Sequence, residues 1–127
     1  MDERIKLTVD LCCATDFDEI IRTGNLNGHG IYYYVPSLLK HFSASDIMSL
    51  IAPRKRLSLN GRYDKLTPID GLIKIDAAMK DEYTRCGAPE NWRMTICDCG
   101  HMETAQFFFG TRRAADLLVF EGRCAAE

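Results

Sequence analysis

Short segments of strand character alternate along this chain with segments of helical character. Residues 5–13, 56–60 and 93–97 are rich in apolar and β-branched side chains, and each predicts a strand. Between the second and third of these strands, apolar side chains recur at helical spacing from residue 69 to residue 86. Strands that alternate with helices indicate a parallel sheet with right-handed crossovers. We therefore predict an α/β fold, a small parallel sheet of about three strands with crossover helices.

The ends of the predicted helices carry local signals. Thr67 before Pro68 predicts the start of the long helix, with Thr67 as the capping residue and proline at the first helical position. Gly87 predicts the end of that helix. Ser45 is expected to cap a second, shorter helix, which Pro53 ends.

The rest of the chain is consistent with one domain that contains a long loop. A length of 127 residues predicts a single domain, and we assign residues 1–127 to one partial α/β domain. Residues 15–45 form a long, cap-like loop segment, within which residues 16–22 and 36–41 predict short helices. Residues 103–120 predict a last helix.

Charge and composition argue against several classes of partner. Lys plus Arg number 16 and Asp plus Glu number 18, so the net charge is −2, whereas a nucleic-acid partner favours a basic surplus. No apolar run approaches the roughly 20 residues that cross a bilayer, and no apolar signal segment follows the charged start. We expect no nucleic acid, no membrane, a cytoplasmic location and six reduced cysteines.

An acid and a histidine follow the last two predicted strands. Asp64 comes shortly after residues 56–60, and His101 comes shortly after residues 93–97. In open α/β sheets, ligand sites lie at the carboxyl ends of the strands, so these two side chains are expected to meet there. A carboxylate bonded to one ring nitrogen fixes the tautomer of a histidine, and the other nitrogen can then take a proton from a nucleophile.

These segments resemble a known family. Asp64 in Gly-Arg-Tyr-Asp-Lys-Leu-Thr-Pro and His101 in Cys-Gly-His-Met-Glu-Thr resemble the last two triad members of α/β-hydrolases. The nearest group is the dienelactone hydrolases and acetyl xylan esterase-like proteins, and residues 46–54 look like the segment that precedes their acid-bearing strand. The resemblance covers residues 5–104. It implies the C-terminal part of a serine hydrolase acting on carboxylic esters, with Asp64 and His101 as catalytic residues and no cofactor.

The nucleophile of this family is absent from the sequence. The family orders its triad as nucleophile, acid, histidine, and the nucleophile sits in Gly-x-Ser-x-Gly. This chain contains neither that motif nor Gly-x-Cys-x-Gly. By analogy the nucleophile would lie just before residue 1. We therefore expect the isolated chain to be inactive, and expect it to meet a small ester substrate only when an N-terminal half complements it.

Other interpretations remain open at this point. Asp16 and Asp18, after the first strand, rival Asp64, because some family members place the acid there. Instead of a hydrolase part, the chain could be a non-catalytic binding or assembly module that uses the aromatic residues 32–34. It could also be a truncated reading frame without independent activity.

Two further clusters have simple explanations. Cys97, Cys99 and His101 form a Cys-x-Cys-x-His pattern, but a zinc site needs a fourth ligand and usually wider spacing. We therefore predict thiols in the core and no metal. The basic residues 54–56 are predicted to be the solvated end of a strand.

The first strand is expected to leave an open edge. Residues 5–13 are nearly all apolar, which suits an interior strand, yet this strand would lack a neighbour on one side. We expect marginal stability or self-association through that edge. A second copy, or a separate N-terminal half, would add a strand there.

Overall fold

The computed structural model describes residue 2, residues 4–31 and residues 34–101. Within these ranges lie three strands and three α-helices: β1 (Leu7–Leu11), α1 (Phe17–Thr23), α2 (Ala44–Ser49), β2 (Lys55–Gly61), α3 (Ile69–Arg85) and β3 (Trp92–Cys97). Short 3-10 turns cover Leu26–Gly28, Leu38–Lys40 and Pro89–Asn91. The helix predicted for residues 103–120 lies outside the described residues. No helix in the described part of the chain is long and apolar enough to cross a membrane.

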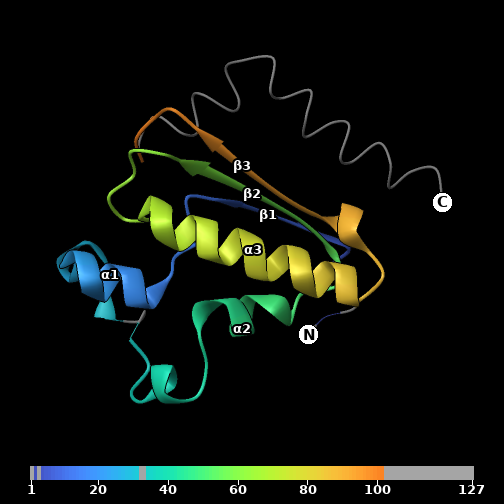
Figure 1. Cartoon of the computed structure of the whole chain (residues 1–127), viewed down its shortest axis with the longest axis horizontal. Helices are drawn as coiled ribbons and strands as arrows, with labels where there is room; N and C mark the ends of the chain where they lie inside the picture. Colours follow the sequence, from blue (N-terminus) through green and yellow to red (C-terminus); the bar gives the residue numbers. More distant parts are fainter. Residues whose placement is uncertain (1, 3, 32–33, 102–127) are drawn as a thin grey trace.

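The three strands form one parallel sheet in the order β1-β2-β3. Leu11 at the end of β1 pairs with Leu59, and Gly61 at the end of β2 pairs with Cys97 at the end of β3. Figure 1 shows the three strands running side by side in one direction. The predicted α/β fold with its small parallel sheet is therefore confirmed, and the carboxyl ends of all three strands share one edge.

The first strand is shorter than the predicted segment 5–13. Cys12 has a φ of 53°, which is outside the extended region, so the regular strand ends at Leu11. Ile5 lies ahead of β1 and is 48% exposed.

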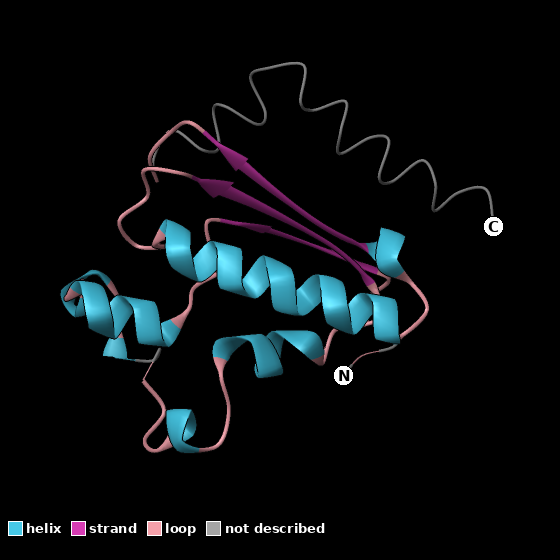
Figure 2. Cartoon of the chain, in the orientation of Figure 1, coloured by secondary structure: helices cyan, strands magenta, loops and turns pink. Residues whose placement is uncertain are grey.

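Helix α3 is the crossover from β2 to β3, and it covers one face of the sheet (Figure 2). Gly87, with a φ of 73°, follows the end of α3, as predicted. The buried side chains of α3 lie on one stripe and pack against residues that follow β1 or begin β3. This core cluster consists of Ala14, Leu72, Ile75, Met79, Tyr83 and Trp92.

A second apolar cluster contains the alternate residues of β2. Side chains on a strand point to opposite faces in turn, so Leu57 and Leu59 face away from Arg56 and Ser58. Leu57 and Leu59 are almost fully buried together with Cys97 and Cys99. On β3 this face also carries Arg93 and Thr95, which pair with Leu57 and Leu59, so both faces of the sheet mix apolar and polar residues.

The prediction that the basic residues 54–56 form a solvated strand end is wrong for Arg56. It is 6% exposed, and its Nε donates to Asp10 Oδ2 over 2.8 Å. Ser58 Oγ donates to the other Asp10 oxygen over 2.6 Å. The Arg56 guanidinium also lies 5.7 Å from the centre of the Trp92 ring. Arg56 is therefore not at a solvated end, because a carboxylate on the next strand and an aromatic ring enclose its charge.

Both predicted N-caps are wrong. The N-cap of α3 is Pro68 rather than Thr67, and no side chain caps that end. The N-cap of α2 is Ser43 rather than Ser45. Ser43 Oγ accepts from Asp46 N over 3.1 Å, and an Asp46 oxygen accepts from Ser43 N over 2.7 Å, which is a capping box. Helix α2 therefore begins after Ser43, because Asp46, three residues later, completes the capping box.

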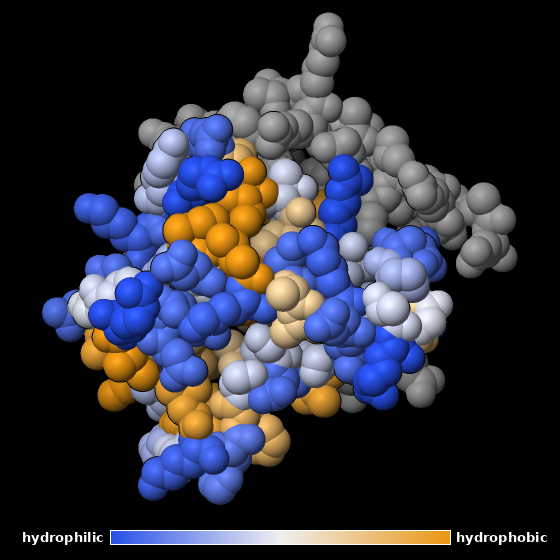
Figure 3. Space-filling model, in the orientation of Figure 1, coloured by the Kyte–Doolittle hydropathy of each residue, from blue (hydrophilic) through white to orange (hydrophobic). Residues whose placement is uncertain are grey.

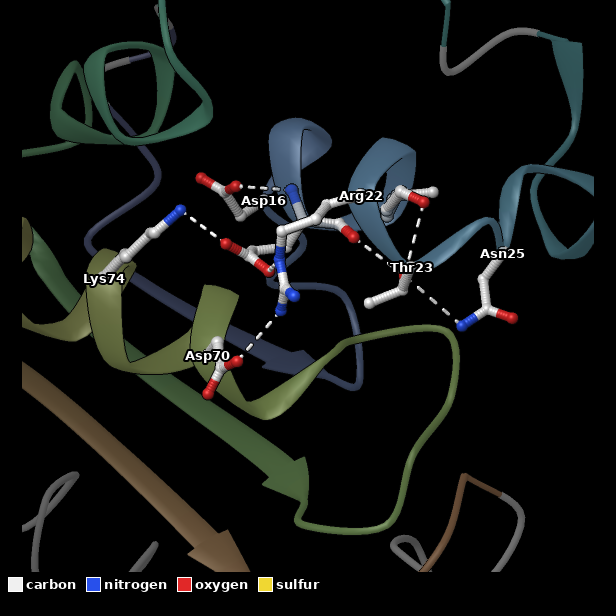
Figure 4. A network of polar contacts seen from close by, with 8 residues as sticks. Asp16, Arg22, Thr23, Asn25, Asp70 and Lys74 are labelled. Atoms are coloured by element: carbon white, nitrogen blue, oxygen red, sulfur yellow. Dashed lines mark hydrogen bonds and ion pairs between the residues drawn. The ribbon is translucent and has the colours of Figure 1, made fainter.

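Charged side chains attach α1 to α3 (Figure 4). Glu19 on α1 accepts from Lys74 Nζ and from Arg22 Nε, each over 2.6 Å. Arg22 also donates to Asp70 over 3.0 Å. The hydrogen bonds from Lys74 and then from Arg22 hold the pKa of Glu19 below its ordinary value. Helix α1 is thus held against the crossover helix by an ionic network rather than by apolar packing alone.

The segment between α1 and α2 leaves large apolar side chains exposed. Ile31 is 88% exposed, Val35 57% and Phe42 55%, and Leu50, directly after α2, is 70% exposed. Figure 3 shows hydrophobic surface at the lower left, where Figure 1 draws this part of the chain. The sheet and α3 instead bury most of their large apolar side chains, with Val9 and Ile73 as exposed exceptions at 46% and 57%.

Candidate functional site

Two loops meet at the carboxyl edge of the sheet, one after β2 and one after β3. Arg62 N donates to Cys97 O over 2.8 Å, and Tyr63 N donates to Cys99 O over 3.0 Å. These main-chain hydrogen bonds continue the pairing of β2 with β3 beyond the strands. The residues that follow on each loop are therefore held at a fixed separation.

Asp64 and His101 come together on these two loops. His101 Nδ1 lies 2.8 Å from Asp64 Oδ2. The Asp64 side chain is fully buried, and 44% of the His101 side chain is exposed. Asp64 Oδ1 accepts from Leu66 N over 2.8 Å, so both carboxylate oxygens have a donor. The structure places the two predicted site residues within hydrogen-bond distance at the expected edge, and their catalytic role stays a prediction.

This pair can accept a proton. The Asp64 carboxylate keeps the ring proton of neutral His101 on Nδ1, which leaves a lone pair on Nε2. The same carboxylate stabilises the imidazolium that forms when Nε2 takes up a proton. Because Asp64 is buried and held by two donors, it orients the ring while the ring itself remains accessible.

The rival acids take other positions. Asp16 is the N-cap of α1, and its Oδ1 accepts from Glu19 N over 3.0 Å, as Figure 4 shows. Asp18 is exposed in the first turn of the same helix. The carboxylate hydrogen-bonded to His101 is that of Asp64.

Sequence reasoning missed a third member of this site. The sulfur of Cys12, a carboxylate oxygen of Asp64 and a ring nitrogen of His101 all lie within 4.8 Å of one another. The signal available in the sequence was the position of Cys12 at the end of a predicted parallel strand, since parallel strands end at a common edge. The prediction instead counted this cysteine as part of the apolar strand.

Cys97 and Cys99 lie in the core. Their sulfur atoms are 2.7 Å apart, and both side chains pack in the apolar cluster that contains Leu57 and Leu59. They play the packing role expected of buried thiols. The three residues of the Cys-x-Cys-x-His pattern therefore have different roles: Cys97 and Cys99 pack in the core, and His101 contacts Asp64.

A metal has no clear place at this site. Thiol, carboxylate and imidazole are all groups that bind zinc, and Cys12, Asp64 and His101 supply one of each. A structural zinc site takes four ligands, and among the described residues this cluster offers three. One oxygen of Asp64 faces His101 and the other accepts from Leu66 N, so the carboxylate is engaged with the ring in this structure.

An apolar hollow of about 360 Å³ lies beside the end of β1. Its walls come from the residues after β1 and from the segment that leads into α2: Cys13, Thr15, Phe17, Val35, Leu38, Ala44, Ile47 and Met48. The same long loop segment reaches the Asp64 loop, because His29 Nε2 lies 2.9 Å from Leu66 O. Part of the segment 15–45 is therefore attached next to the Asp64–His101 pair.

Comparison with known proteins adds a relative by sequence. No family model matches the chain. Over 105 residues the chain is 52% identical to a Bacillus subtilis (strain 168) protein named "Putative hydrolase YtaP". This match covers 83% of the chain and 35% of the relative, so the chain spans about a third of that protein's length.

A solved structure gives a relative by fold. The esterase Pf2001 of Pyrococcus furiosus superposes with a TM-score of 0.61 at 18% sequence identity. The match covers 95% of this chain and 45% of the esterase. At that identity the likeness concerns the fold. Taken with the Bacillus match, it shows that the chain is related to hydrolases and carries part of an esterase-like α/β fold, as its resemblance to the α/β-hydrolases implies.

Proposed function

We propose that the chain supplies the acid and the histidine of a Ser-His-Asp triad to a hydrolase of carboxylic esters. The observation that carries the proposal is the 2.8 Å contact between His101 Nδ1 and the buried Asp64 carboxylate at the carboxyl edge of the sheet. A histidine oriented in this way serves as the base of nucleophilic catalysis. The family resemblance, closest to dienelactone hydrolases and acetyl xylan esterases, supplies the substrate class.

The proposed chemistry follows from the pair. His101 takes the hydroxyl proton of a serine as the serine oxygen attacks the ester carbonyl carbon, and Asp64 stabilises the imidazolium that results. His101 then protonates the leaving alkoxide as the carbon–oxygen bond breaks, which leaves an acyl-serine. A water molecule, deprotonated by His101, attacks this ester and releases the carboxylic acid.

Three of the five serines of this chain have hydrogen-bond partners away from the Asp64–His101 pair. Ser43 caps α2, Ser49 Oγ donates to Asp46 O over 2.7 Å, and Ser58 is fully buried with its hydroxyl on Asp10. Because the chain has no Gly-x-Ser-x-Gly motif, the proposal takes the nucleophile from residues outside it. The Bacillus relative is long enough to contain them, because this chain spans 35% of it.

The edge of the sheet at β1 is the place we propose for the complementing part. Among the described residues, β1 pairs with β2 alone, and Val9 in its middle is 46% exposed. Its outer main-chain groups can pair with a further strand. When that strand is absent, the same edge favours self-association of the chain.

A chimera tests the proposal. The segment of the Bacillus relative that matches this chain is replaced by the chain itself, and hydrolysis of p-nitrophenyl acetate is measured. We expect turnover in the chimera. His101→Ala and Asp64→Asn are each expected to lower kcat by about 10³-fold or more. Sedimentation should show that the chain alone associates and that the chimera does so less.

Matched controls are available on the chain. His41→Ala removes another exposed histidine, and Asp81→Asn alters an exposed acid on α3; both are expected to leave turnover unchanged. A folded chimera with full activity after His101→Ala would contradict the proposal. A folded chimera that binds the ester without any turnover would favour the binding-module interpretation instead.

A further inference from the structure

Cys12 is a nucleophilic side chain that the proposed function does not use. It follows the last residue of β1, and its main-chain N donates to Leu59 O over 2.8 Å. Its sulfur lies within 4.8 Å of both an Asp64 oxygen and a His101 ring nitrogen. A nucleophile, a base and an orienting acid are thus present together on this one chain.

The backbone at Cys12 is also unusual. Its φ of 53° lies in the left-handed region, which costs a residue with a Cβ about 1–3 kcal/mol when the rest of the fold imposes it. Here a cysteine occupies that conformation at the edge where Asp64 and His101 meet.

We propose that Cys12 is itself an acyl acceptor: its thiol, deprotonated by His101, attacks activated carboxylic esters and holds the acyl group as a thioester. The distance in the unliganded protein suits this role, because contacts between nucleophile and base are often longer in the resting state and tighten around a substrate. The proposal shares the Asp64–His101 pair with the proposed function, and it needs no residue from outside the chain.

The step balances within the site. The thiol proton passes to the ring nitrogen of His101, and the sulfur forms a bond to the carbonyl carbon of the ester. The carbon–oxygen bond to the leaving group breaks, and His101 returns the proton to the departing alkoxide or phenoxide. The products are an S-acyl cysteine and an alcohol or phenol, and no oxidant or reductant takes part.

Cys13 provides an internal control. It is the next residue, it is exposed, and its sulfur lies 3.3 Å from Leu11 O. Cys12 is only 9% exposed. If access to solvent alone governed reactivity, Cys13 would react first. Faster reaction at Cys12 therefore requires activation of its thiol by the neighbouring base.

The experiment uses the full chain, with p-nitrophenyl acetate as the probe at neutral pH. The two cysteines share one tryptic peptide, so Cys13→Ser is used to report on Cys12 and Cys12→Ser to report on Cys13. Release of p-nitrophenolate gives the rate, and the peptide mass gains one acetyl group at the acylated residue. We expect Cys12 to be acylated about tenfold faster than Cys13, or more.

The dependence on the pair is measured in the Cys13→Ser background. His101→Gln should slow acylation of Cys12 by about 10²-fold, and Asp64→Asn, which keeps the side-chain shape, should slow it in the same direction. His41→Gln should have no effect. Circular dichroism identifies any variant that fails to fold, and the comparison of Cys12 with Cys13 needs neither His101 nor Asp64 to be changed.

Several results would overturn the proposal. Acylation of Cys13 ahead of Cys12 would do so, as would acylation of Cys12 that is unchanged in a folded His101→Gln variant. Acylation of Cys12 only after unfolding in urea would show a buried, inert thiol. An inactive chimera together with rapid acylation of Cys12 would reject the proposed serine hydrolase and leave this inference standing, so the two failures are distinguishable.

Discussion

The unit formed by residues 55–97 and the segment formed by residues 24–50 use apolar side chains in opposite ways. In the first, Leu57, Ile75 and Tyr83 are at most 1% exposed. In the second, Ile31 and Leu50 are 88% and 70% exposed. The first consists of β2, the 17-residue helix α3, a short 3-10 turn and β3, whereas the second has 3-10 turns and the six-residue helix α2.

This difference shows which part can position a site. The loops that hold Asp64 and His101 extend from strands in the buried unit, and main-chain hydrogen bonds fix them to each other. The exposed segment reaches the site loop where His29 Nε2 donates to Leu66 O. We infer that the buried unit sets the geometry of the pair, and that the exposed segment is suited to contact a substrate of the proposed hydrolase.

The largest expected effect separates the two regions by stability. Ile75→Ala empties a fully buried position in α3, and we expect it to lower the free energy of unfolding by about 2–5 kcal/mol. Leu50→Ala removes an exposed side chain and should change it by less than about 0.5 kcal/mol. Urea denaturation followed by circular dichroism measures both. Equal losses would remove the distinction between the regions.

A pH experiment examines the buried unit further. Burial raises the pKa of Tyr83 from 10.0 to about 12, and its hydroxyl donates to Arg54 O over 2.6 Å. The folded protein keeps this proton where the unfolded chain loses it. Tyr83 therefore stabilises the fold fully below pH 10, and the contribution, on the order of 2 kcal/mol, is lost as the pH rises towards 12.

Two variants isolate the Tyr83 contribution from the other groups that titrate at high pH. Tyr83→Phe should flatten the decline in unfolding free energy between pH 10 and 12, whereas Tyr63→Phe, at a residue 66% exposed, should preserve it. The measurement is urea unfolding at a series of pH values. A decline that is the same in all three proteins would contradict burial as the cause.

The smallest effect tests how the exposed segment is held at α2. Ser43→Ala removes both hydroxyl contacts of the capping box and should cost about 1 kcal/mol. Ser45→Ala changes a serine already inside the helix and should cost almost nothing. Thermal melting of the two variants, compared with the unaltered chain, measures the difference. A larger loss for Ser45→Ala would show that the cap assignment is wrong.

Much of the fold followed from local pattern, and the failures have local causes. The strand and helix order, the parallel pairing and the end of α3 before Gly87 were predictable from periodicity and glycine. The N-caps were not predictable, because several neighbouring residues could start each helix. The burial of Arg56 was not predictable either, because a basic residue at a strand end is usually solvated. Its partner Asp10 is 46 residues away in sequence.

The candidate site divides in the same way. Asp64 and His101 could be proposed from sequence, because each follows a strand of a predicted parallel sheet and each matches a family motif. The choice of Asp64 over Asp16 as the hydrogen-bond partner of His101 needed the structure. Asp16 caps the start of α1, where its carboxylate accepts a hydrogen bond from Glu19 N. From the sequence alone, a capping aspartate after a strand looks the same as a site aspartate after a strand.

The sequence by itself determined which residues can form strands and helices, and that all three strands end at one edge, because these properties depend on the spacing of apolar residues a few positions apart. Tertiary structure alone decided that Cys12 joins Asp64 and His101 and that Asp10 encloses the charge of Arg56. Both contacts join residues some 40 to 90 positions apart. The contact between Asp10 and Arg56 depends on the register between β1 and β2. The position of the Cys12 sulfur depends in addition on the backbone of that residue, which has a φ of 53°. No pattern along the chain carries that information.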